Sequence, residues 1–263
     1  MKCLLKAFPR LLQFAHLLVR IQDRLIIRTV TFGFSRMLNT VPLERRGTIY
    51  GGWWSPVEYI SSTSKRVLVS AGLGFDTSFD KEMILSGYSV IGLDPGIDSC
   101  TQAVKDLENL GPFKILNKGI STFVGVENFF EPKLANHKSW STLNIGKTKD
   151  SCKHYFEVTS IDQLFKDFTD LAEADFKFLK MDVEGAELAI LENASNGVFR
   201  FDFIGIEMDF LSLIPFLNIR KRVHHVIRAR RIMNRFKENG FILVLTENFN
   251  FFWSKRIQGM SVT

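Results

Sequence analysis

The stretch 66–94 constrains the fold of this chain more than any other part of the sequence. Residues 66–70 (RVLVS) and 88–93 (YSVIGL) are two short apolar runs, separated by a glycine turn at 71–76 and a segment of helix-forming composition at 78–86. Strands that are covered by helices on both faces are continuously apolar in this way, because neither face meets water. The order of strand, glycine turn, helix and strand predicts the first half of a Rossmann-type parallel sheet.

The glycine turn and the acid after the second strand predict a nucleoside-binding site. Gly72 and Gly74 allow a tight turn, and Asp94 follows Gly74 by 20 residues, the spacing at which an acid typically binds ribose hydroxyls. A dinucleotide would place its pyrophosphate at the start of the next helix, where Asp76 would repel it. S-adenosylmethionine has no phosphate and carries two cationic groups. It is therefore the expected cofactor rather than NAD, and these four residues are the predicted cofactor-binding residues.

A second acidic strand tip is expected at the same edge of the sheet. In the stretch 176–191 an apolar run leads to Asp182 and Glu184, Gly185 supplies a turn, and helix-forming residues follow. Glu187, at the start of that helix, is interpreted as a helix cap. Open α/β sheets bind ligands at the carboxyl ends of their strands, so Asp182 and Glu184 are expected beside the nucleoside site.

Two later regions complete the expected sheet. Residues 203–207 (FIGIE) predict a further strand that ends in an acid. Residues 240–246 and 251–253, joined around Asn248-Phe249-Asn250, predict a closing antiparallel hairpin.

These motifs resemble those of the FkbM-type S-adenosylmethionine-dependent methyltransferases. The specific match is LKMDVEGAE at 179–187; VTSIDQL at 158–164, NGF at 239–241 and GLGFDTSFD at 72–80 are also similar to that family. The resemblance covers roughly residues 50–253. It implies an α/β fold, a Rossmann-like class I methyltransferase whose seven-stranded sheet is mostly parallel with an antiparallel last strand.

The chain departs from the general methyltransferase pattern at one position. That pattern places an acid just before the glycine turn, where this chain has Ser70 or Ala71. Asp76 is the expected substitute for its contact with the ammonium group of the cofactor.

The expected reaction is methylation of an oxygen. Methyl transfer from a sulfonium is an in-line displacement, so the protein mainly aligns donor and acceptor. A hydroxyl acceptor must also lose its proton to a base, for which Asp182 is the first candidate and Glu184 the second. The family resemblance makes a sugar hydroxyl or related glycan group the expected acceptor. The alternatives are a NAD-type oxidoreductase and a non-catalytic, membrane-associated binding protein on the same fold.

Two further expectations concern the same edge of the sheet. The spacing of the acids gives no support to a metal site, so none is predicted. The segment 139–142 (SWST) is expected beside this edge, as a contact to adenine or acceptor or as a plain surface loop.

Positive charge is concentrated in two segments. The chain has a net charge of +6, but residues 1–36 carry seven Lys and Arg against one acid, and residues 210–237 carry eight against none. The rest of the chain is therefore acidic. From Pro9 onward polar and basic side chains recur at three- or four-residue spacing, on one helical face. They are Arg10, Gln13, His16, Arg20, Arg24 and Arg28. This predicts a basic amphipathic helix in an N-terminal segment, residues 1–49, that precedes a methyltransferase domain at 50–263.

The basic helices at 9–30 and 220–237 leave several interpretations open. For both, one is a solvated basic face on a helix packed against the domain, and another is contact with an anionic membrane surface. A signal peptide or signal anchor is a further alternative for the first helix, and a lipid-linked sugar phosphate, an acidic glycan or nucleic acid is a further partner for the second. No apolar run reaches the roughly 18 residues that span a bilayer. Three scattered cysteines without zinc-site spacing indicate a reducing cytoplasm, with a peripheral position on the membrane as the alternative. Nucleic acid is the least favoured partner, because no binding module is present. The oligomeric state is left open.

Overall fold

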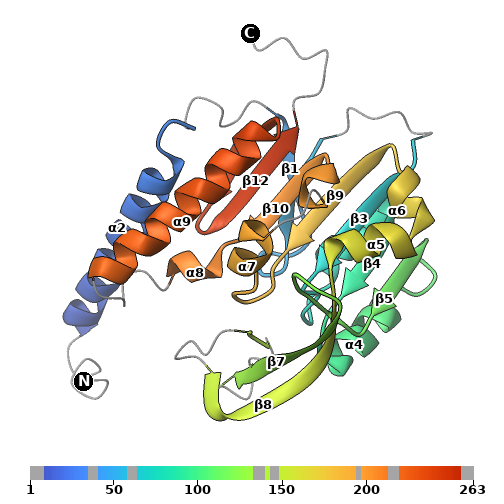
Figure 1. Cartoon of the computed structure of the whole chain (residues 1–263), viewed down its shortest axis with the longest axis horizontal. Helices are drawn as coiled ribbons and strands as arrows, with labels where there is room; N and C mark the ends of the chain where they lie inside the picture. Colours follow the sequence, from blue (N-terminus) through green and yellow to red (C-terminus); the bar gives the residue numbers. More distant parts are fainter. Residues whose placement is uncertain are drawn as a thin grey trace.

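The computed structural model describes residues 9–34, 41–57, 64–132, 140–142, 148–193, 197–212 and 219–255. A seven-stranded sheet with the order β11-β12-β10-β9-β3-β4-β5 forms its centre (Figure 1). The strands are β3 (Arg66–Ala71), β4 (Tyr88–Leu93), β5 (Phe113–Leu116), β9 (Phe176–Met181), β10 (Phe203–Glu207), β11 (Phe241–Glu247) and β12 (Asn250–Lys255). Neighbouring strands in the run β10-β9-β3-β4-β5 are parallel to each other. Strand β12 is antiparallel to both of its neighbours, β10 and β11. The predicted mostly parallel sheet with an antiparallel last strand is therefore confirmed.

Helices cover both faces of this sheet and create two hydrophobic cores. The helices are α3 (Ser78–Leu85), α4 (Ile97–Leu107), α5 (Ile161–Asp167), α6 (Thr169–Glu173), α7 (Glu187–Glu192), α8 (Asp209–Ser212) and α9 (Ile219–Glu238), with a 3-10 turn at Val198–Arg200. Residues of α5, α6, α7 and α9 contribute to one core, and residues of α3 and α4 to the other. The strands are apolar on both sides because both sides are covered.

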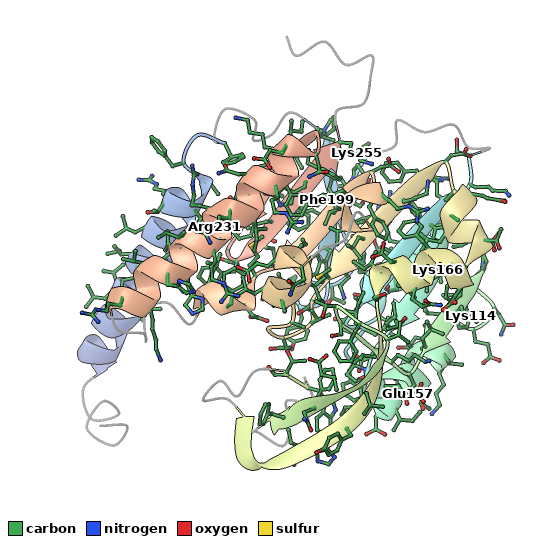
Figure 2. All side chains as sticks on the ribbon, viewed as in Figure 1. Lys114, Glu157, Lys166, Phe199, Arg231 and Lys255 are labelled. Carbon is green, nitrogen blue, oxygen red and sulfur yellow. The ribbon has the colours of Figure 1, made fainter. Side chains whose placement is uncertain are left out.

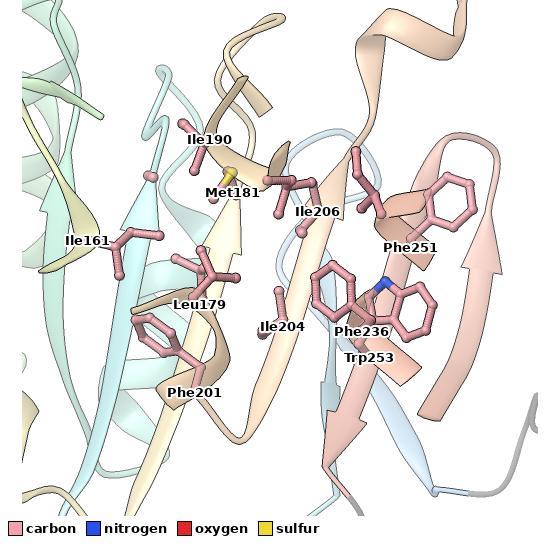
Figure 3. Close-up of a cluster of buried hydrophobic side chains, with 14 of the residues drawn as sticks. Ile161, Leu179, Met181, Ile190, Phe201, Ile204, Ile206, Phe236, Phe251 and Trp253 are labelled. Carbon is pink, nitrogen blue, oxygen red and sulfur yellow. The ribbon is translucent and has the colours of Figure 1, made fainter. Parts of the chain in front are cut away.

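One of the two hydrophobic cores lies between α9 and the last strands of the sheet. Leu179 and Ile204, which are neighbours in register on β9 and β10, project into it (Figure 3). Phe236 of α9 stacks on Trp253 of β12 with ring centroids 4.7 Å apart. The aromatic residues of this sequence thus fill the space between the last strands and their covering helix.

A smaller sheet lies beyond the carboxyl ends of β9 and β10 (Figure 1). It has the order β6-β8-β7 and consists of β6 (Gly119–Ile120), β7 (Gly125–Pro132) and β8 (Thr148–Thr159). Ser141 pairs with Phe130 of β7 in an isolated bridge, which brings the segment 140–142 to the same side.

The N-terminal region adds a helix and a hairpin. Helix α2 (Pro9–Thr31) packs along α9, and Arg230 of α9 donates to the backbone carbonyl of Val30 at 2.9 Å. Strands β1 (Leu43–Arg46) and β2 (Trp53–Pro56) pair with each other, and Arg45 contacts Glu247 of β11 at 2.8 Å. The boundary expected after residue 49 falls in the loop of this hairpin, so β1 lies before it and β2 after it. None of the described helices has the length and apolar character that crossing a bilayer requires.

Candidate functional site

The glycine turn after β3 and the acid after β4 meet at the carboxyl edge of the sheet, as the sequence predicted. Gly72 has a φ of +82°, and a Cβ added there would lie 1.7 Å from the carbonyl oxygen of Asp182. Only glycine fits between these two strand ends. The amide of Gly74 donates to Oδ2 of Asp94 at 3.0 Å, and the amide of Gly96 donates to Oδ1 at 2.7 Å. Asp94 therefore joins the glycine turn to the start of α4.

Asp76 lies on the same turn, but other partners hold its carboxylate. Oδ1 accepts from the amide of Ser78, the first residue of α3, at 3.0 Å, and Oδ2 accepts from the hydroxyl of Thr48 in the β1–β2 loop. Burial works to raise the pKa of Asp76, but these hydrogen bonds lower it overall, so the carboxylate is ionised at neutral pH. A fixed negative charge at the start of α3 disfavours a pyrophosphate there. Direct contact between Asp76 and a cofactor stays a prediction.

Four carboxylates gather where β9 and β10 end. Asp182 and Glu184 follow β9, Glu207 is the last residue of β10, and Asp209 begins α8. Oxygen atoms of Asp182, Glu184 and Asp209 all lie within 4.8 Å of one another. The sequence predicted the position of the first two at this edge, recorded Glu207 only as a strand end, and missed Asp209. The available signal was the second acid two residues after the strand-ending acid, in the segment EMD.

Glu187 fixes the turn that carries Asp182 and Glu184. This side chain is fully buried, and its Oε1 accepts from the amides of Val183 at 3.2 Å and Gly185 at 3.0 Å. Glu184 has a φ of +50°, a left-handed conformation that costs a non-glycine residue roughly 1 kcal/mol. The sequence favoured a helix cap for Glu187; its carboxylate instead binds backbone amides of the preceding turn.

Burial and like charge shift the pKa values of this cluster toward neutrality. Burial, with the nearby charges of Glu184 and Asp94, raises the pKa of Asp182 to about 6 against the opposing effect of Lys180. Burial, followed by Asp182 and the other acids, raises the pKa of Glu207 to about 8. Asp182 is therefore suited to exchange a proton near neutral pH while Glu207 keeps its own.

Lys180 belongs to the motif that the sequence identified, but it received no role there. Its side chain is only 4% exposed, and Nζ donates to the carbonyl of Gly72 at 2.6 Å and lies 5.3 Å from the ring centre of Trp53. Its positive charge works to lower the pKa of Asp182, Asp94 and Glu207. Lys180 thus ties the ends of β3 and β9 together and offsets part of the negative charge. It also works to lower the pKa of Asp80, a second buried acid that the sequence did not single out.

The segment 140–142 lies against this edge, as expected. The hydroxyl of Ser141 donates to the carbonyl of Glu184, and Nε1 of Trp140 lies 3.4 Å from where a Cβ on Gly96 would be. The Trp140 ring also contacts the rings of His154 and Phe156 on β8, at centroid distances of 4.7 and 4.9 Å. These three rings form an aromatic wall beside the site. Ser139 lies outside the described residues.

The arrangement can accommodate a nucleoside with cationic substituents. A Cβ added at Gly74 would meet no atom within 4 Å, so the turn borders open space. Both oxygens of Asp94 accept an amide, but a carboxylate offers about four acceptor positions and so retains capacity for ribose hydroxyls. The oxygen atoms of Asp182, Glu184 and Asp209 are also the ligand type that a divalent cation such as Mg²⁺ prefers.

Known proteins similar to this chain give its family. Residues 85–243, which run from the end of α3 into β11, match the family described as the methyltransferase FkbM domain. A solved structure of a SAM-dependent methyltransferase from Methanosarcina mazei is similar at 15% identity and a TM-score of 0.28, over 75% of this chain and 74% of that one. No curated protein matches. The family match covers more than half of the chain and includes the acidic strand ends of β9 and β10, so the chain belongs to the FkbM methyltransferase family.

Proposed function

We propose that this chain transfers a methyl group from S-adenosylmethionine to a hydroxyl oxygen of a sugar or related glycan. The observation that carries the proposal is Asp182, a carboxylate with a pKa of about 6 that lies beside the glycine turn and Asp94. Membership of the family supports methyl transfer and this donor. The aromatic wall supports a sugar acceptor, because the apolar face of a sugar ring packs well on aromatic side chains.

In this proposal some residues of the site bind the donor, and another removes the proton of the acceptor. S-adenosylmethionine, when bound, supplies an electrophilic methyl group on its sulfonium. Gly72 and Gly74 leave room for its nucleoside, and Asp94 accepts the ribose hydroxyls. The acceptor hydroxyl lies at the carboxyl ends of β9 and β10 in this arrangement. Asp182 takes the hydroxyl proton as the oxygen acquires the methyl group and the bond between that group and sulfur breaks. The neutral thioether S-adenosylhomocysteine then leaves, and the proton passes to solvent.

The surrounding charges keep Asp182 suited to this role. Burial and the neighbouring acids raise its pKa, Lys180 works to lower it, and the resulting pKa of about 6 leaves Asp182 ionised at neutral pH. Glu184 lies close enough to serve as the second candidate for the base. A NAD-type oxidoreductase is disfavoured by the ionised Asp76 at the start of α3.

The substitution Asp182→Asn tests the base. We expect methyl transfer to fall by about 100-fold or more, because general bases contribute about that much, while the dissociation constant for S-adenosylmethionine changes by less than about threefold. Transfer of a labelled methyl group to a panel of mono- and oligosaccharides measures the rate, and calorimetry measures donor binding. The control is Asp170→Asn, an exposed acid on α6.

The product of the same assay tests the acceptor atom. A methyl ether on oxygen survives mild alkali, whereas a methyl ester does not. Label that is lost in alkali, or that is found on nitrogen, would contradict a hydroxyl acceptor. Undiminished transfer by the Asp182 variant would show that another group accepts the proton.

A further inference from the structure

The outward side of helix α2 carries many large apolar side chains among its polar ones, although a helix packed on a domain normally turns polar residues to solvent. Its exposed side carries five large apolar side chains that are each 44–77% exposed. They are Leu17, Leu18, Ile21, Leu25 and Phe32, the last just after the helix. Among the described side chains of this helix, Val30 belongs to the core of the domain, Ile26 packs against that core, and Thr31 is buried. The sequence left a packed helix and a membrane helix as alternatives; α2 is packed on α9 and still leaves apolar residues in solvent.

Helix α9 extends this apolar surface. It runs beside α2 along the edge of the molecule (Figure 1), and its Val223 and Ile227 are exposed. Between the two helices lies an open groove of about 420 Å³, lined by Leu25, Arg28, Thr29, Phe32 and Arg230. Single exposed leucines are ordinary, but seven exposed large apolar side chains along two packed helices with a groove between them are typical of an interaction site.

Arginines border this surface on α2. Arg20, Arg24 and Arg28 recur every four residues, so they form one row along the helix, and all three are exposed. Asp23 is the one acid in the sequence of α2, and its side chain is partly buried. The surface is therefore positively charged as well as apolar.

The basic residues of α9 separate into two groups. Arg228 forms an ion pair with Glu192 of α7, Arg230 binds the end of α2, and Arg235 donates to the carbonyls of Leu191 and Glu192. These three attach α9 to its neighbours, so only some of the basic residues of this helix lie on a solvated face. Arg220 and Arg231 are exposed, and Figure 2 labels Arg231 on this helix.

We propose that the outer surface of α2 and α9 binds a membrane surface that contains anionic lipids. In the following, the docking surface means Leu17, Leu18, Ile21, Leu25, Phe32, Val223 and Ile227 with the bordering Arg20, Arg24 and Arg28. Helices that lie in a membrane interface combine apolar side chains, which enter the acyl boundary, with arginines, which contact phosphate headgroups. The docking surface has both components, and charge complementarity favours an anionic lipid surface over a neutral one. The proposal is independent of the methyltransferase reaction.

Vesicle flotation of the full chain tests this docking surface. The probes are vesicles of phosphatidylcholine alone and vesicles in which part of it is replaced by phosphatidylglycerol. We expect binding to the anionic vesicles and at least about tenfold weaker partitioning to the neutral ones. Replacement of the three bordering arginines by glutamine should reduce anionic binding by about tenfold or more. The control replaces exposed Lys81, Lys105 and Lys166 by glutamine, which lowers net charge equally on α3, α4 and α5.

A second pair of variants tests the apolar part. Leu18→Gln, Leu25→Gln and Phe32→Ser together should also reduce binding by about tenfold or more, because less apolar area enters the lipid. Leu85→Gln and Val104→Gln, exposed on α3 and α4, should not reduce it. Circular dichroism and methyl transfer to a soluble acceptor should be unchanged in all variants, since none lies at the carboxyl edge of the sheet.

Three outcomes would overturn the proposal. The first is equal flotation of the wild type and the docking-surface variants, and the second is equal binding to neutral and anionic vesicles. The third is absence of vesicle binding together with a dimer in light scattering that the Leu18, Leu25 and Phe32 substitutions dissociate. That result would assign the same surface to a second copy of the chain.

Discussion

Gly72 and Asp182 meet because of the register between two strands. Ala71 of β3 pairs with Met181 of β9, so the next residue of each strand emerges at the same point of the sheet edge. The close approach of the Gly72 Cα to the Asp182 carbonyl leaves no room for a side chain. The position of the candidate base is therefore tied to the glycine turn by close backbone packing, which the hydrogen bond from the Asp182 amide to the Ala71 carbonyl reinforces.

Gly72→Ala tests this contact. Alanine at this position is strained by the left-handed backbone conformation, and its Cβ collides with the Asp182 carbonyl oxygen. We therefore expect Gly72→Ala to lower the free energy of unfolding and to weaken donor binding by about tenfold or more. Gly240 has the same φ of +82° and no atom within 4 Å of an added Cβ, so Gly240→Ala introduces backbone strain without a steric clash. Urea unfolding should show Gly72→Ala to be less stable than Gly240→Ala by about 2 kcal/mol. Equal losses in the free energy of unfolding of the two variants would contradict the close contact between Gly72 and the Asp182 carbonyl.

The raised pKa of Glu207 leads to a prediction of how the stability of the chain depends on pH. Its pKa is raised from the ordinary 4.5 to about 8, so the folded chain keeps a proton that the unfolded chain releases above pH 4.5. This contribution to stability is complete below the unfolded pKa and is lost as pH rises through the folded pKa. Glu207→Gln cannot ionise, so between about pH 5 and about pH 8 its free energy of unfolding should fall less than that of the wild type, by at least about 1 kcal/mol.

Urea unfolding at several pH values in this range measures that difference. Glu238→Gln, an exposed residue at the end of α9, should keep the wild-type pH dependence. The same pH dependence in the Glu207 variant would mean that this carboxyl group ionises normally in the folded chain.

At the scale of elements, α9 is a connector as well as a basic surface. Arg228 and Arg235 join it to α7, the helix that follows the acidic turn, and Arg230 joins it to α2. The hydrogen bonds from Arg228 to Glu192 raise the pKa of Arg228 and lower that of Glu192. The position of α2 on the domain thus depends on the residues of α9 that face inward.

Substitution of these arginines separates the two roles. We expect Arg228→Met to destabilise the chain by about 1 kcal/mol, because a two-point contact between a guanidinium and a carboxylate is lost from a partly buried position. Arg231→Met, on the exposed side of the same helix, should change stability by less than about 0.5 kcal/mol. Thermal unfolding of both variants measures the contrast. Equal stability of the two variants would place Arg228 among the solvated residues.

At the scale of the whole molecule, local pattern predicted the sheet and part of the site. The apolar runs at 66–70 and 88–93 became β3 and β4, because a buried parallel strand needs apolar residues on both faces. The meeting of Gly74 with Asp94 followed from the same pattern. The general rule for strand ends also predicted that Asp182 lies beside the glycine turn. It could not identify which other side chains of distant segments meet, because no local period encodes those contacts.

The missed features are of this second kind. Asp209 follows the strand-ending Glu207 by two residues, but its meeting with the acids after β9 depends on the pairing of β9 and β10. Lys180 of β9 reaches Gly72 at the end of the neighbouring strand β3. Asp76 carries a charge that the sequence predicted, but its partner Thr48 comes from a hairpin that the sequence did not identify. The exposed apolar side of α2 depends on which side of the helix meets α9. In each case the sequence showed the type of the residue but did not show which residue it contacts in the folded chain.

Cofactor binding is the most direct test of the central claim, that the edge formed by β3, β4 and β9 is a donor site for methyl transfer. Calorimetry with the full chain should show binding of S-adenosylmethionine and none of NADH. Asp94→Ala should weaken donor binding by about tenfold or more, because a charged hydrogen-bond acceptor is lost. Binding of NADH without binding of S-adenosylmethionine would contradict the claim.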